Sequence, residues 1–139
     1  MFLLYKVANY KNKTISIFGK KAFVVISGSM VPEIQVGDIV IMNGSNDANV
    51  GDIIAFRRNS KVIVHRVMQR INLKGKIVYT TKGDNNAIAD SGFVDKSMVE
   101  GVYLTKIPAI GSVIMYISDN LEGIIAVVII AVVCKHSIE

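Results

Sequence analysis

The chain has 139 residues, enough for one compact domain but too few for a second catalytic domain. Hydrophobic residues make up 51% of it and charged residues 19%, which excludes a wholly membrane-embedded chain and suggests a soluble body with an apolar end. The net charge of +5 comes from scattered lysines and arginines with no aromatic pattern between them, so we expect no nucleic-acid partner.

Residues 1–22 are interpreted as a basic N-terminal arm. Only five apolar residues precede the first lysine, too few for a signal-peptide core or a membrane span. The lysines of this arm favour either solvent exposure or contact with anionic lipid headgroups. They are Lys6, Lys11, Lys13, Lys20 and Lys21.

Between residues 23 and 118, short runs rich in Val and Ile alternate with Gly, Asn, Asp and Ser, which predicts a mainly β domain. The runs are Phe23–Ile26, Ile39–Met42, Ile53–Phe56, Val62–Val67 and Ile77–Thr81. The stretches VGDIVIM (36–42) and VGDIIAF (50–56) are similar, and each predicts a Gly-Asp turn that leads into a strand. The longest irregular stretch, 84–93, is typical of a loop that carries chemistry.

Residues 119–139 are interpreted as a membrane-associated C-terminal segment. Gly123–Cys134 is a run of twelve uncharged residues, followed by Lys135 and His136. A helix needs about 20 residues to cross a bilayer, so the run fits either a buried element of the core or a short membrane-inserted helix. The basic pair that follows it favours the short helix.

Ser29 is the candidate nucleophile, and it lies in SGSMVP (27–32) directly after an apolar strand. A serine hydroxyl needs a base to accept its proton and an N–H group to stabilise the developing oxyanion. Gly28 leaves space beside Ser29, and Pro32 fixes the exit of the turn. By itself, however, a Ser-Gly-Ser sequence after a strand is more often a simple turn.

His65 is the candidate base. Strand alternation in VIVHRV (62–67) places it on an apolar face, where a histidine can also be an ordinary core residue. Imidazole titrates near neutral pH, so it is a natural acceptor for a serine proton. A carboxylate on its other ring nitrogen would fix the tautomer, and Asp84 and Asp90 are the candidates. Taken alone, Asp84 is more typical of a turn residue, and Asp90 is more typical of a solvated loop acid.

Taken together and in this order, the motifs resemble the type I signal peptidases. They are SGSMVP, VGDIV, VGDIIAF, VHRV and TKGDNNAIAD, and they lie between residues 23 and 108. His65 stands where the familiar bacterial enzymes carry a lysine, so the chain is similar to the Ser-His branch found in the endoplasmic reticulum, archaea and some Gram-positive bacteria, in peptidase family S26. The resemblance implies a fold of antiparallel β sheets, shared with repressor-type peptidases, and a short C-terminal apolar helix.

The resemblance also implies residue roles. Ser29 would be the nucleophile and His65 the general base. Asp90 would be the acid of the triad and Asp84 a second required carboxylate, although either acid could face His65. The Ser27 hydroxyl and the Ser29 N–H group would form the oxyanion hole, and we expect neither a metal nor a cofactor.

Members of this branch are membrane-bound serine endopeptidases that cleave signal peptides from exported preproteins after small residues. We therefore expect signal peptides and membrane lipid as partners, and a catalytic domain on the extracytoplasmic or lumenal face of the cell membrane. Whether accessory subunits are needed stays open. Relatives carry a full membrane span before the region that corresponds to Ser16, so we expect that span to be missing here.

Two other functions stay open. A self-cleaving repressor-type peptidase would share the β architecture, but it would need a lysine base and an N-terminal DNA-binding helix pair, and neither is visible. A small β-barrel binding module on a membrane would use the Ser-Gly-Ser turn and His65 only as structural features.

Overall fold

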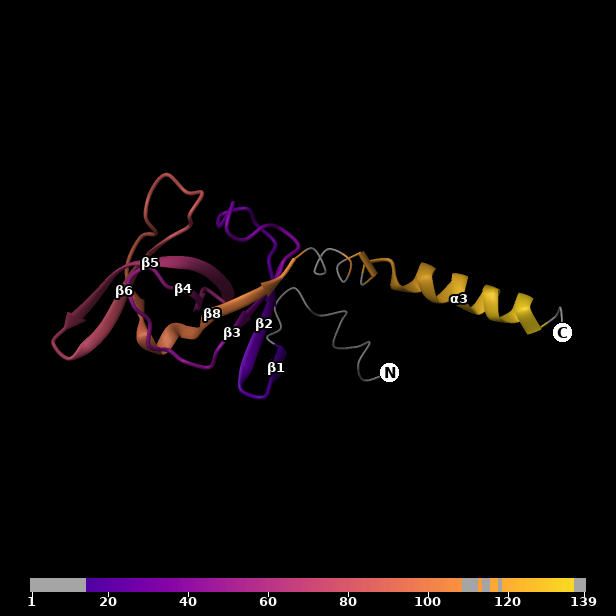
Figure 1. Cartoon of the computed structure of the whole chain (residues 1–139), viewed down its shortest axis with the longest axis horizontal. Helices are drawn as coiled ribbons and strands as arrows, with labels where there is room; N and C mark the ends of the chain where they lie inside the picture. The colour runs from indigo at the N-terminus through magenta and orange to yellow at the C-terminus, as the bar shows by residue number, and fades with distance from the viewer. Residues whose placement is uncertain (1–14, 109–112, 114–115, 118, 137–139) are drawn as a thin grey trace.

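The computed structural model describes residues 15–108, 113, 116–117 and 119–136 (Figure 1). These described residues form eight β strands, a short 3-10 helix and an α-helix. The strands are β1 (Ile15–Ile17), β2 (Lys20–Val24), β3 (Ile39–Met42), β4 (Ile53–Arg58), β5 (Lys61–Leu73), β6 (Lys76–Lys82), β7 (Val94–Asp95) and β8 (Val99–Ile107). The helices are η2 (Lys96–Met98) and α3 (Leu121–His136).

All strand pairs are antiparallel, in the order β1-β2-β3-β8-β4-β5-β6-β7. The last strand of the chain, β8, therefore returns to the middle of the order and joins β3 to β4. Strand β5 pairs with β4 through Lys61–Arg66 and with β6 through Arg66–Leu73. It therefore connects these two neighbouring strands. The predicted mainly β, antiparallel fold is confirmed.

Strand β4 explains how the core is built. Its first four residues, Ile53–Phe56, are all buried, as expected for a strand that is covered on both faces. Successive side chains of a strand point to opposite faces. Ile53 and Ala55 therefore lie in one apolar cluster, with Phe23 and Met30, and Ile54 and Phe56 lie in a second cluster. The second cluster contains Ala48, Val67, Tyr79, Val94 and Val99. The two cores thus lie on opposite sides of β4.

The sheet begins earlier in the chain than the predicted start at residue 23. Strand β1 and the start of β2 fall within the range interpreted as a basic arm, because a Phe18-Gly19 turn with positive φ at both residues closes a hairpin there. Lys21 forms an ion pair with Glu100 of β8, so this lysine is part of the folded body. The preceding fourteen residues, and with them the expectation of a missing membrane span, lie outside the described residues.

The predicted short C-terminal helix is present as α3, which extends away from the sheet (Figure 1). Its apolar side chains are exposed, so the alternative of a buried core element does not fit. Val127 and Ile130 are 67% and 62% exposed. In the part of the chain that the structure describes, no helix combines the length and the apolar character that crossing a membrane requires.

Replacing Tyr79 with Phe should lower the free energy of unfolding by about 1–3 kcal/mol. The fully buried Tyr79 hydroxyl accepts a hydrogen bond from Ala48 N (3.1 Å) and donates one to Asn46 O (3.2 Å), so its loss leaves a buried N–H group without an acceptor. Urea unfolding followed by circular dichroism measures the effect. Tyr103→Phe is the matched control, because the half-buried Tyr103 hydroxyl makes no hydrogen bond to a described residue. Equal losses in both variants would contradict the prediction.

Candidate active site

Ser29 lies in a tight turn that follows strand β2. The turn is closed by backbone hydrogen bonds from Val31 N to Gly28 O (3.2 Å) and from Ile34 N to Met30 O (2.9 Å). The side chains of Met30 and Ile34 are buried in the first apolar cluster, which anchors the turn. Ser29 itself stays half-buried at the surface, so its hydroxyl is held in place by its neighbours and remains reachable.

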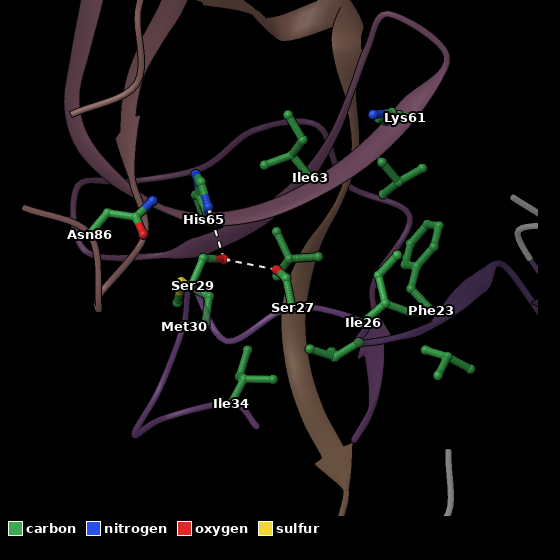
Figure 2. Close-up of a pocket in the computed structure, with 14 residues that line it drawn as sticks. Phe23, Ile26, Ser27, Ser29, Met30, Ile34, Lys61, Ile63, His65 and Asn86 are labelled. Carbon is green, nitrogen blue, oxygen red and sulfur yellow. Dashed lines mark hydrogen bonds between the residues drawn. The ribbon is translucent and has the colours of Figure 1, made fainter. Parts of the chain in front are cut away.

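Ser29, His65 and Asp90 form a continuous chain of contacts. His65 Nε2 lies 3.1 Å from Ser29 Oγ (Figure 2), and His65 Nδ1 lies 2.6 Å from Asp90 Oδ2. His65 projects from the middle of β5 and is only 8% exposed. With a proton on Nδ1 donated to Asp90, Nε2 is free to accept the proton of the Ser29 hydroxyl. This arrangement is able to activate a serine oxygen for attack on a carbonyl carbon.

Asp84 lies apart from this chain and pairs with Arg66. Arg66 Nε donates to Asp84 Oδ1 (2.8 Å) and Nη2 donates to Oδ2 (2.6 Å), while Nη1 donates to Gly51 O (2.8 Å). Because Arg66 follows His65 on β5, the two side chains leave opposite faces of the strand. The Arg66 guanidinium lowers the pKa of Asp84 below its ordinary value. Of the two candidate acids, Asp90 is therefore the one that contacts His65.

The loop from Gly83 to Asp90 also holds the turn that carries Ser29. Asn85 N donates to Ser29 O (2.8 Å), and the Asn85 side-chain amide donates to Gly28 O (3.2 Å). Gly83 allows this approach, since a Cβ atom on it would lie 2.7 Å from Ser29 O. Sequence reasoning missed Asn85, because its bonds reach across more than fifty residues and no local pattern predicts them.

Thr81 is a second residue that sequence reasoning missed. Its hydroxyl donates to Asp90 Oδ2 (2.7 Å), the same oxygen that His65 contacts, and Asp90 N donates back to Thr81 O (2.8 Å). Thr81 is 1% exposed, and a hydroxyl that deeply buried needs a partner. The one signal in the sequence is a polar residue at an inward position of the strand Ile77–Thr81, two residues after the buried Tyr79.

Ser27 lies beside the candidate nucleophile. Its hydroxyl oxygen is 3.5 Å from Ser29 Oγ, and the side chain is exposed toward the same opening (Figure 2). A hydroxyl in this position can donate to an oxygen that binds next to Ser29.

An apolar groove of about 520 Å³ leads to these residues (Figure 2). Its walls are the segments 23–26 and 61–64, and Ser29 and His65 lie along it. The described residues contain no group of three or more His, Cys, Asp or Glu side chains that could hold a metal ion. The groove fits an extended apolar segment better than a charged small molecule.

Comparison with known proteins identifies the family. Residues 8–92 match the family model described as Peptidase S24-like. The signal peptidase complex catalytic subunit SEC11 of Debaryomyces hansenii is 35% identical over 124 residues, covering 78% of this chain and 74% of that protein. The same subunit of Candida tropicalis is 36% identical over 123 residues, with the same coverage. The chain belongs to the type I signal peptidase family.

The resemblance inferred from the five ordered motifs is thereby confirmed. The residues that match the Peptidase S24-like model span strands β1 to β6. Within this signal peptidase, the matched residues 8–92 include Ser29, His65, Asp84 and Asp90.

Replacing Thr81 with Val should lower peptidase activity roughly ten- to a hundredfold, because Asp90 loses one of the two donors that orient its carboxylate. The drop should appear in kcat with little change in KM, and Thr81→Ser should restore most of it because it keeps the hydroxyl. Thr80→Val is the matched control, since Thr80 is half-buried and its side chain makes no hydrogen bond to a described residue. If Thr81→Ser is as slow as Thr81→Val, the hydroxyl does not act through Asp90.

The Arg66–Asp84 pair should make stability depend on pH in acid. The pKa of Asp84 is lowered in the folded state, so the pair stabilises the protein fully above the ordinary value of 3.8 and loses this effect as the pH falls through the folded-state pKa. Asp84→Asn should therefore unfold at lower urea concentration than the parent at neutral pH, and the gap should close in acid below 3.8. Asp119→Asn, at an exposed acid with no ion pair to a described residue, should show no gap. A gap for Asp84→Asn that is constant with pH would contradict the assignment.

Proposed function

We propose that this signal peptidase is a membrane-bound serine endopeptidase that removes signal peptides from exported preproteins after small residues. The observation that carries the proposal is the chain of contacts from Ser29 through His65 to Asp90, in which Ser29 and His65 line an apolar groove. The relatives are named as catalytic subunits of a signal peptidase complex, which supports the same activity.

In this proposal Ser29 is the nucleophile and His65 the general base. His65 Nε2 takes the hydroxyl proton while Ser29 Oγ bonds to the scissile carbonyl carbon, and Asp90 stabilises the imidazolium that forms. His65 then gives this proton to the leaving amine as the peptide bond breaks. Water adds to the acyl-enzyme with His65 again as base, which releases the signal peptide and restores Ser29.

The oxyanion that forms during each step is assigned to the Ser29 N–H group and the Ser27 hydroxyl. The distance of 3.5 Å between the two serine hydroxyl oxygens supports this role, because it puts the Ser27 hydroxyl close enough to donate to an oxygen that binds beside Ser29.

Asp84 is proposed to support the site indirectly. Its bidentate pair with Arg66 fixes the start of the loop whose next residue, Asn85, holds Ser29 O. In this scheme Asp84 is a positioning residue, and Asp90 is the acid that acts on the base.

The substrate is proposed to bind as an extended strand in the groove, between the segments 23–26 and 61–64. Main-chain hydrogen bonds would supply affinity, and shallow apolar pockets would select small side chains before the scissile bond. Ile26 and Ile63 line this groove, and their apolar surfaces suit small aliphatic side chains.

We further propose that residues 23–118 carry catalysis and that residues 119–139 associate with the membrane, with a basic arm in residues 1–22 that continues into β1 and β2. The exposed apolar surface of α3 supports insertion into lipid. The family resemblance supports a catalytic body on the extracytoplasmic or lumenal face, and a cytoplasmic position of Lys135 and His136 agrees with the bias of basic residues toward that side. The names of the relatives support accessory subunits as partners.

The alternatives have less support. A self-cleaving repressor-type peptidase would use a lysine base, whereas Ser29 contacts His65 and no described lysine hydrogen-bonds to it. A non-catalytic binding module gives no reason for a serine, a histidine and a half-buried acid to share one chain of contacts.

Cleavage of a preprotein in detergent or lipid should fall by roughly four orders of magnitude in Ser29→Ala and His65→Ala. Asp90→Asn should cost roughly two to four orders, because an amide no longer favours the tautomer with a proton on Nδ1. Asp84→Asn keeps the His65–Asp90 contact and should cost roughly tenfold through weaker positioning. Gel analysis of the cleaved product measures all four.

Ser91→Ala is the control, since the exposed Ser91 side chain makes no hydrogen bond to a described residue. Full cleavage by Ser29→Ala would favour the binding module instead. A larger loss in Asp84→Asn than in Asp90→Asn would reverse the roles of the two acids.

A further inference from the structure

Asn86 lines the same groove as Ser29 and His65, but neither the motif analysis nor the reaction scheme gives it a role. It is half-buried in the loop between β6 and β7, and its backbone N–H donates to Gly83 O (3.0 Å). Its side chain packs over Gly83 so closely that a Cβ atom on this glycine would lie 2.8 Å from Asn86 Nδ2. The amide is therefore held in a defined place beside the site.

The Asn86 amide makes no hydrogen bond to any described residue, although it offers two N–H groups and a carbonyl oxygen. Its neighbour Asn85 is different, because the Asn85 side chain already donates to Gly28 O (3.2 Å). Figure 2 shows the Asn86 amide end directed toward His65, on the side of the imidazole away from Ser27. Asn86 is thus a fixed polar group that faces the groove and is open to a bound molecule.

The reaction determines what lies on that side of His65. The carbonyl oxygen must point toward Ser27 and the Ser29 N–H group, while the leaving nitrogen must reach His65 Nε2 to receive its proton. The peptide that follows the scissile bond therefore leaves past His65, on the side where Asn86 lies (Figure 2). We propose that Asn86 binds the main chain of this leaving peptide, an inference that rests on the proposed function.

An amide suits this task because it can donate to a peptide carbonyl and accept from a peptide N–H group, whatever side chains the substrate carries. Such a contact exists only while the leaving peptide is attached or has just been cut. Asn86 should therefore affect formation of the acyl-enzyme and leave its hydrolysis unchanged.

Two substrates with the same residues before the cut test the proposal. One is a peptide that continues several residues beyond the scissile bond, and the other ends there in an aminocoumarin leaving group. Asn86→Ala should lower kcat/KM roughly tenfold for the long peptide and leave the short substrate unchanged within about twofold. Asn46→Ala is the matched control, because the Asn46 side chain is exposed and makes no hydrogen bond to a described residue. Equal losses on both substrates, or no loss on either, would overturn the proposal.

Binding in the Ser29→Ala background separates this inference from the proposed function. The long peptide should bind roughly tenfold more tightly than the same peptide truncated at the scissile bond, and adding Asn86→Ala should remove this difference. If the parent chain cuts neither substrate, the proposed function is overturned, and the binding comparison still decides whether Asn86 holds the leaving side. If Asn86→Ala leaves the difference intact, Asn86 has no such role.

Discussion

The hydrogen bond between His65 Nδ1 and Asp90 Oδ2 is the interaction on which the rest of the site depends. It fixes the direction of the imidazole ring, and with it the nitrogen that faces Ser29. Asp90 lies in a loop, so it needs support of its own, and Thr81 supplies this through its hydroxyl and its backbone carbonyl. Thr81 thus orients Asp90, and Asp90 orients His65. His65 in turn contacts Ser29.

This order is possible because a buried strand packs against His65. Strand β4 is buried on both faces, and its Phe56 packs edge-on against His65 with ring centroids 6.4 Å apart. His65 is therefore in contact with the second apolar cluster while its ring nitrogens face polar partners. Packed strands position catalytic side chains accurately, because a close-packed protein interior permits few alternative rotamers.

The sequence predicted the strands that alternate cleanly and the residues that lie in family motifs. The predicted run Ile39–Met42 has the bounds of β3, and the motif match is confirmed by the family. The sequence did not predict that Lys20 and Lys21 begin a strand, because Lys21 pairs with Glu100, which is 79 residues away in the chain. Likewise, no local pattern distinguished Asp84 from Asp90, because their partners lie on opposite faces of one strand.

The two acids show how one short loop serves several tasks. Adjacent residues of β5, His65 and Arg66, point to opposite faces, so acids at the two ends of the loop can each bind one of them. The loop is thereby fixed at both ends, which constrains the residues between. Asn85 then holds the backbone of Ser29, and Asn86 is left facing the groove. Loss of the ion pair between Arg66 and Asp84 should therefore shift the positions of Ser29 and Asn86, while the His65–Asp90 hydrogen bond stays in place.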